Sequence, residues 1–163
     1  MLVTSNGIKD GMIEEKYGGR GTQFDDYGTP NCSIPLKIEG APTGTKSYAI
    51  VIEDKDAYPI SGGFVWFHWL LANLTRNELF ENESISAKDF IQGCNSWFSQ
   101  NGREASSFYG GMAPPDAPHL YEIHVYALDI LLDLNNSFYL NELYHKMDRH
   151  ILESYTLKGI YKN

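Results

Sequence analysis

The sequence has few cysteines and lacks any apolar run long enough to cross a bilayer, which takes about 20 residues. Its first residues do not carry the basic segment and apolar core of a secretory signal peptide. We therefore expect a cytoplasmic protein without stable membrane association. The two cysteines, Cys32 and Cys94, have no metal-ligand spacing, and in a reducing compartment we expect free thiols. A Cys32–Cys94 disulfide is the alternative that an oxidising compartment would favour.

Basic residues are also scarce. The chain has 13 Lys and Arg against 21 Asp and Glu, a formal net charge of −8. A protein that binds the phosphate backbone of nucleic acids needs a basic face, and so does one that docks on anionic lipid. No Lys/Arg cluster is present, so we expect neither nucleic acid nor an anionic membrane surface as a partner.

What the sequence does contain is a series of short β-branched and aromatic runs separated by Gly/Pro turns. With 163 residues and no repeat, linker or low-complexity tract, it predicts a single domain, 1–163. Such runs favour a mainly β sandwich or barrel over alternating β-α units. The predicted strands are Leu2 to Ser5, Leu36 to Glu39, Ser47 to Glu53, Val65 to Ala72 and Tyr121 to Ala127, with Phe90 to Cys94 as a weaker sixth.

The last part of the chain has a helical pattern. Apolar residues at helical spacing predict an amphipathic helix over Leu140 to Leu157, capped near Ser137 or Asn141. A helical turn is predicted within Ser84 to Phe90. The segment Asn95 to Pro118 reads as a long loop, and loops of that length in compact domains are usually functional or disordered. The residues of the helical pattern are Leu140, Leu143, Tyr144, Met147, Ile151 and Tyr155.

Three ionisable residues lie beside the apolar runs. Asp54 follows one strand in phase with Ile52, and His119 precedes another in phase with Tyr121. His68 lies inside a third, in phase with Leu70 and Ala72. Because a core-facing ionisable group is costly unless it is paired, these groups should meet each other or a ligand. A structural Asp–His hydrogen bond is the alternative to a ligand site.

The same residues lie in two longer motifs. Asp54-Lys55-Asp56-Ala57 is followed by the His68-Trp69 strand, and Tyr109-Gly110-Gly111 leads through Pro114-Pro115 to His119-Leu120-Tyr121. In residue types and spacing these motifs resemble those of the phosphatidylethanolamine-binding protein family, in its bacterial Raf-kinase-inhibitor-like branch. The resemblance extends from about Tyr17 to Tyr161.

The resemblance implies a β-sandwich of the phosphatidylethanolamine-binding type with peripheral helices, including one near the C-terminus. It implies a non-enzymatic binding protein without a cofactor, which takes phosphate-like anions or phosphorylated groups in a small polar pocket. Kinase-inhibitor-like regulation of partner proteins is a further implication. So is a homodimer, with Trp97 and Phe98 as candidate interface residues. The pocket residues carried over are Asp54, His68, Gly111, His119 and Tyr121.

Each of these residues has an expected role. His68 and His119 offer N–H donors, and at least one becomes imidazolium when an anion binds. Tyr121 offers a hydroxyl, and Gly111 lets the backbone approach an oxyanion with its N–H. Asp54 holds a histidine in one tautomer or binds an amine or hydroxyl of the ligand.

The chain departs from the family pattern at three positions. Lys55 and Tyr58 replace prolines, which should loosen the turn that carries Asp54, and Asp56 should shape that turn. Leu120 replaces an arginine, so we expect weaker anion binding than in relatives that keep it. The remaining histidines are predicted to lie outside the pocket: His124 on the opposite strand face, and His145 and His150 on the C-terminal helix.

Three other functions fit parts of the pattern. Asp54, His68 and His119 could form a facial metal site. Ser106 or Ser107 could act with His119 and Asp54 in a hydrolase, although no Gly-x-Ser-x-Gly motif is present. An interaction protein without a small-molecule ligand is the third.

Overall fold

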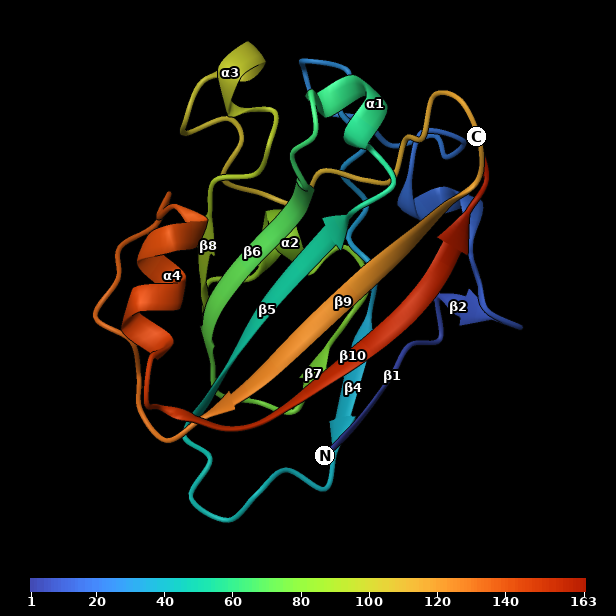
Figure 1. Ribbon diagram of the computed structural model, residues 1–163. Helices are drawn as coiled ribbons and strands as arrows, with labels where there is room; N and C mark the ends of the chain where they lie inside the picture. The colour runs from blue at the N-terminus through green and yellow to red at the C-terminus, as the bar shows by residue number, and fades with distance from the viewer.

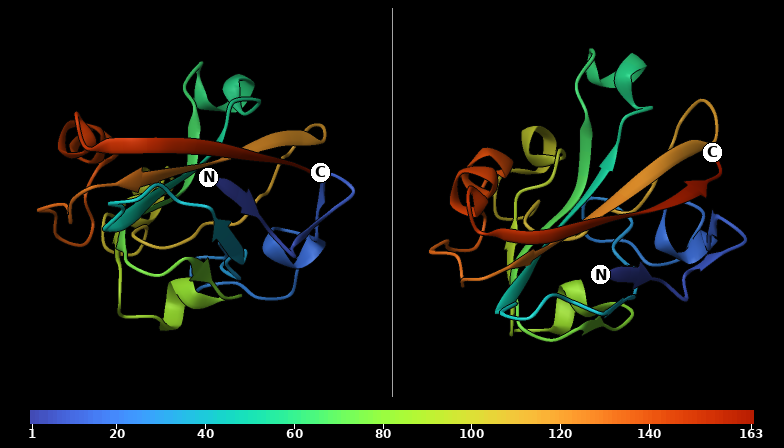
Figure 2. Two further views of the ribbon diagram at one scale, coloured as in Figure 1. Left: turned by 90° about the horizontal axis from the view of Figure 1, so that it is seen from below. Right: turned by 60° about the horizontal axis from the view of Figure 1, so that its bottom comes forward.

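A computed structural model describes all residues, 1–163. The strands form a seven-stranded sheet in the order β2-β3-β10-β9-β5-β6-β8 and a three-stranded sheet in the order β1-β4-β7 (Figures 1 and 2). None of the helices has both the length and the hydrophobicity of a membrane-spanning segment. The larger sheet contains β2 (Ile8–Lys9), β3 (Met12–Ile13), β5 (Ser47–Asp54), β6 (Trp66–Leu74), β8 (Ile91–Gly93), β9 (His119–Leu128) and β10 (Ile151–Tyr161); the smaller contains β1 (Leu2–Thr4), β4 (Leu36–Glu39) and β7 (Glu78–Leu79).

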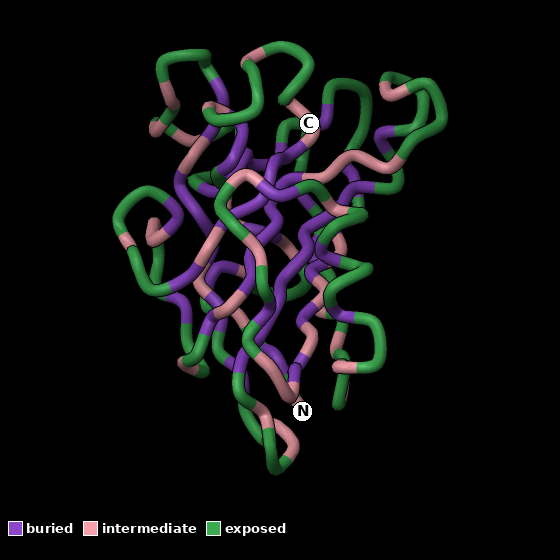
Figure 3. The backbone as a smooth tube through the Cα atoms, turned by 90° about the vertical axis from the view of Figure 1, so that its left-hand side faces the viewer, coloured by how far each residue is buried: buried purple, intermediate pink, exposed green.

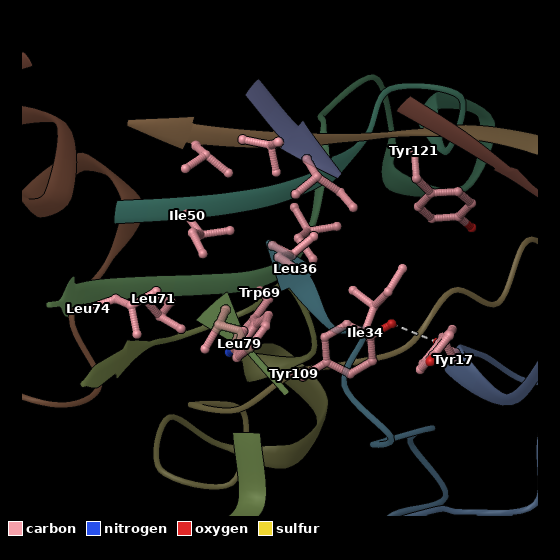
Figure 4. Packing of buried hydrophobic residues seen from close by; sticks show 14 of the residues in the cluster. Tyr17, Ile34, Leu36, Ile50, Trp69, Leu71, Leu74, Leu79, Tyr109 and Tyr121 are labelled. Atoms are coloured by element: carbon pink, nitrogen blue, oxygen red, sulfur yellow. Dashed lines mark hydrogen bonds between the residues drawn. The ribbon is translucent and has the colours of Figure 1, made fainter. Parts of the chain in front are cut away.

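The main hydrophobic core lies between the two sheets. Ile50 and Ile52 of β5 pack with Leu36 and Ile38 of β4 in one buried cluster (Figure 4). The buried segments run through the middle of the molecule, and the exposed ones are mostly at its loops (Figure 3). The predicted mainly β sandwich is confirmed.

The outer face of the larger sheet carries a second, smaller core. Ala49 and Val51 of β5 pack there with Leu143 and Met147 of the helix α4 (Leu140–Met147). Every residue of β5 is buried, because the small sheet covers one of its faces and this second cluster lies on the other. β5 therefore provides a rigid base for the residue at its end, Asp54.

The C-terminal helix is shorter than predicted. It ends at Met147, and the predicted helical residues from Ile151 onward form β10, which pairs antiparallel with β9. Arg149, with φ of 65°, lies in the connection. The prediction of a longer helix was wrong because Ile151 and Tyr155 are four residues apart, a spacing that fits both a helical turn and the alternation of a strand. The backbone N–H of Tyr139 donates to Glu142 at 2.7 Å, so the helix starts there rather than at Ser137 or Asn141.

The other predicted elements are found near their expected places. The six predicted strands are all present, and the helical turn near Ser84 is α2 (Glu83–Ser86). The long predicted loop contains one short helix, α3 (Phe98–Asn101). The sequence did not reveal η1 (Glu15–Tyr17), α1 (Tyr58–Ser61) or the short strands β2, β3 and β7.

A break in strand register reorients His68. Trp69 pairs with Ile52 and Phe67 with Glu53, so β6 holds one extra residue, His68, between these pairs. The simple alternation that placed His68 in phase with Leu70 was therefore wrong. Leu70 lies in the outer core, whereas the His68 ring lies 5.1 Å from the ring of Tyr121, a residue of the inner core. Register shifts of this kind re-aim side chains next to functional sites.

Candidate ligand-binding pocket

The predicted polar residues meet at one end of the larger sheet. Asp54, the last residue of β5, pairs with Tyr121 of β9 on one side and with Trp66 of β6 on the other. The short helices α1 and α3 lie at the same end of the molecule, at the top of Figure 1. They border a cavity of about 250 Å³. It is lined by Asp54, Ala57, Ile60, Trp66, His68, Trp97, Gln100, Ala113, Pro114, Pro115, His119 and Tyr121.

His119 lies between two carboxylates. Its Nδ1 is 2.8 Å from Oδ2 of Asp54, and its Nε2 is 2.9 Å from Oδ1 of Asp116. Burial lowers the pKa of His119, but the hydrogen bonds and charges of Asp54 and Asp116 outweigh burial and raise it above the ordinary value. Since a carboxylate only accepts, an imidazolium that donates from both ring nitrogens satisfies this arrangement best.

His68 is fixed in one tautomer. Its Nδ1 lies 2.8 Å from the carbonyl oxygen of Gly110, which can only accept, so Nδ1 carries the proton. Burial lowers the pKa of His68 and keeps the ring neutral. Its Nε2 is therefore an acceptor, and this buried nitrogen has no hydrogen-bond partner in the protein.

The hydroxyl of Tyr121 is the second unsatisfied group in the cavity. It is buried and has no hydrogen-bond partner. Burial, and then the charge of Asp54, raise the pKa of Tyr121, so the hydroxyl keeps its proton. The cavity thus holds a free acceptor on His68 and a free hydroxyl donor on Tyr121, and leaving both unsatisfied costs stability.

The turn after β5 is held by its own aspartates. Oδ1 of Asp54 accepts the backbone N–H of Asp56 at 2.9 Å and that of Ala57 at 3.2 Å. Asp56 accepts the N–H of Leu120 at 2.9 Å, which links the turn to β9, whereas the hydrogen bonds within the turn are accepted by Asp54. Although Lys55 replaces a family proline, these hydrogen bonds fix the position of Asp54 without it.

Gly111 does not present its N–H to the cavity. That N–H donates to the carbonyl oxygen of Pro30 at 2.6 Å, and Gly111 is not among the lining residues. A Cβ at this position would lie 2.6 Å from the backbone oxygen of Tyr17. The structure therefore places Gly111 in a close backbone crossing beside the pocket and does not support the expected N–H contact with an oxyanion.

Two residues at the pocket were not assigned to it from the sequence. Asp116 could have been identified from the sequence, because it is an acidic residue three positions before His119 in a proline-rich segment. Trp97, expected at an interface, lines the cavity, and its ring is edge-on to His68 at 5.3 Å. Phe98 is 48% exposed, and the homodimer stays a prediction.

The serines required for a hydrolase are not in place. Ser107 donates to the carbonyl oxygen of Arg103 at 2.7 Å, and the hydroxyl of Ser106 has no partner. Neither residue lines the cavity with His119 and Asp54. A Ser–His–Asp relay is therefore not assembled.

The ligand atoms of Asp54, His68 and His119 do not all converge within metal-binding distance. The group that does converge is Glu53, Glu122 and His124 on the outer face of the sheet. Its carboxylates are already engaged by lysines: Lys158 and then Lys55 hold the pKa of Glu122 at about 2. His124 lies 3.1 Å from Glu53 on that face, away from the pocket as predicted.

His145 lies on α4, as predicted, but His150 lies beyond the helix, where its Nδ1 is 2.9 Å from Asp129. Neither residue lines the cavity of Asp54 and His119. Both therefore stay outside the pocket, although the shorter helix places only one of them on a helical face.

Comparisons with known proteins agree on one family. Residues 4–162 match the family model described as phosphatidylethanolamine-binding protein. The chain is 41% identical over 148 residues to the YxkA protein of Bacillus subtilis (strain 168), covering 86% of this chain and 88% of that one. It is 30% identical over 166 residues to a UPF0098 protein of Chlamydia trachomatis serovar D, covering 99% of each.

Solved structures show the same fold. A phosphatidylethanolamine-binding protein homologue from Chlamydia trachomatis superposes with a TM-score of 0.80 at 29% identity, covering 99% of this chain and 96% of that one. YbcL from Escherichia coli superposes with a TM-score of 0.77 at 24% identity, covering 99% and 98%, which shows the fold alone. The chain belongs to the phosphatidylethanolamine-binding protein family and is a binding protein of that type.

Proposed function

We propose that the protein is a non-enzymatic cytoplasmic binding protein that holds a phosphate-like anion or a phosphorylated group in the pocket of Asp54, His68, His119 and Tyr121. One observation carries the proposal: two buried polar atoms, Nε2 of His68 and the Tyr121 hydroxyl, lack partners beside a histidine whose pKa is raised. Buried polar groups are normally satisfied, and a ligand is the partner that these two lack.

The hydrogen-bonding character of the two atoms limits the kinds of ligand that fit the pocket. Nε2 of neutral His68 needs a donor, and the Tyr121 hydroxyl can donate. A singly protonated phosphate group offers a P–OH for His68 and bare oxygens for Tyr121 and for Nε2 of His119. Sulfate offers oxygens only and would leave His68 unsatisfied. The pocket therefore fits protonated phosphate better than sulfate.

The charges at the pocket set a condition on anion binding. No Lys or Arg lines the cavity, so the cation available to the anion is the imidazolium of His119. Its Nε2 is engaged by Asp116, whose side chain is 51% exposed. For a phosphate oxygen to reach Nε2, the Asp116 carboxylate must move into solvent. With Leu120 in the place of the family arginine, this should give modest affinity.

Calorimetric titration with methyl phosphate at about pH 6 tests the proposal. We expect binding by the wild type and a loss of about tenfold or more in His119→Gln, which removes a charge-assisted hydrogen bond. His124→Gln is the matched control, because His124 lies on the outer face of the same strand. Equal losses in both variants, or no binding by the wild type, would contradict the proposal.

A further inference from the structure

A second cavity of about 310 Å³ lies beside the pocket of Asp54 and His119. It is formed by the segment around residues 25–31, by Ile85 of α2, and by the segment 95–109. The two cavities share a single lining residue, Trp97. The second cavity is therefore a separate site with its own chemistry.

Three accessible aromatic rings lie at this cavity. Tyr27 and Phe108 are exposed at 61% and 42%, and Trp97 is partly buried. Tyr109 also lines the cavity but belongs to the inner core. The faces of aromatic rings carry negative potential and attract cations, most strongly where water is excluded.

Two carboxylates lie at the same cavity, and no Lys, Arg or His lines it. Oδ1 of Asp25 accepts the backbone N–H of Tyr27 at 2.9 Å and of Thr29 at 2.8 Å, which fixes that carboxylate. No basic side chain among the lining residues pairs with Asp25 or Asp26, so the cavity does not neutralise their negative charge. Rings and unpaired carboxylates together favour a positively charged ligand and repel an anion.

A buried hydroxyl in the wall also lacks a partner. Ser106 is 2% exposed, and its Oγ makes no hydrogen bond. The neighbouring amides are satisfied, since Asn95 donates to the carbonyl oxygen of Phe108 at 2.9 Å and Asn101 to the hydroxyl of Thr29 at 3.3 Å. The Ser106 oxygen is the polar group that a ligand N–H or O–H would complete.

We propose that this cavity binds a small organic cation, an amine with an apolar body. The ammonium lies against the aromatic rings and the carboxylates of Asp25 and Asp26, and the apolar body covers Ile85 and Phe108. A volume of about 310 Å³ lies at the lower end of the range for small-molecule sites.

Phenethylammonium and phenylacetate test this proposal as a matched pair, because they share an aryl body and differ in the sign of their charge. At pH 7 we expect phenethylammonium to bind about tenfold or more tightly than phenylacetate, as the carboxylates attract one and repel the other. Both affinities are measured by NMR from the Ser106 and Phe108 amide resonances, because these residues line the second cavity alone, whereas Trp97 lines both cavities and phenylacetate can also enter the pocket of His119.

Two variants locate the binding. Asp26→Asn should weaken phenethylammonium about three- to fivefold, in line with an exposed ion pair, and Tyr27→Leu should do so to a similar degree by removing a ring face. Asp133→Asn, at a fully exposed carboxylate elsewhere, should change nothing. The proposal is overturned if both probes bind equally, if neither binds at millimolar concentration, or if Asp26→Asn and Tyr27→Leu leave the affinity unchanged.

Discussion

Oδ1 of Asp116 lies 2.9 Å from Nε2 of His119, while Asp54 binds the other nitrogen of the same ring. The protein's own carboxylate thus takes the hydrogen bond that a phosphate oxygen would need. Since the side chain of Asp116 is half exposed and that of Asp54 is buried, Asp116 is the partner that the proposed ligand would displace.

Removing this internal competitor should strengthen anion binding. In Asp116→Asn we expect the affinity for methyl phosphate at about pH 6 to rise about fivefold. The ligand must break the hydrogen bond between His119 and residue 116, and this bond is weaker with a neutral asparagine than with a charged aspartate. Calorimetric titration measures the change, and Asp148→Asn, an exposed carboxylate beyond α4, is the control. A lower affinity in Asp116→Asn would mean that Asp116 helps to hold the ligand.

The raised pKa of His119 predicts how stability depends on pH. The folded protein holds this proton more tightly than the unfolded chain does. The contribution of His119 to the free energy of unfolding is therefore complete below about pH 6.5 and is lost as pH rises through the raised pKa of the folded state. The difference in unfolding free energy between the wild type and His119→Gln should therefore shrink from about pH 6 to about pH 9. His68 has a lowered pKa and acts in the opposite direction, but it is present in both proteins. Urea unfolding at several pH values measures the difference, and a difference that grows with pH would contradict the assignment.

Strand alternation was sufficient for most of the fold, and the family motifs were sufficient for the meeting of Asp54, His68, His119 and Tyr121, although alternation alone assigned His68 to the wrong face. It was not sufficient for contacts set by tertiary structure. The extra residue at His68 depends on the pairing of β6 with β5, and the N–H of Gly111 is taken by Pro30, which is distant in sequence. The predicted C-terminal helix was too long because the spacing of Ile151 and Tyr155 fits both the helical and the strand period.

The second core predicts that α4 is needed for stability. Met147 is buried against the outer face of the sheet. Met147→Asp would bury an unpaired carboxylate and should destabilise the protein by roughly 3 kcal/mol or more. Thermal or urea unfolding measures this. Lys146→Asp, next to it on the exposed side of the helix, should have a much smaller effect, and similar losses in both variants would show that burial of Met147 is not the cause.

The two cysteines are free and buried, and burial raises the pKa of both thiols. We therefore expect protein isolated without oxidant to contain two free thiols that react with a thiol reagent slowly in the folded state and rapidly after denaturation. Intact mass and thiol counting measure this. A native Cys32–Cys94 disulfide would contradict both this expectation and the proposed cytoplasmic location.

NMR of the histidine side chains during titration with methyl phosphate at about pH 6 tests the central claim most directly. We predict that free His68 is neutral with its proton on Nδ1, and that His119 is protonated on both nitrogens. Methyl phosphate should shift Nε2 of both residues and leave His124 unchanged, and sulfate at equal concentration should bind more weakly. If methyl phosphate binds without shifting His68 or His119, or if sulfate binds at least as tightly, the pocket does not act as described.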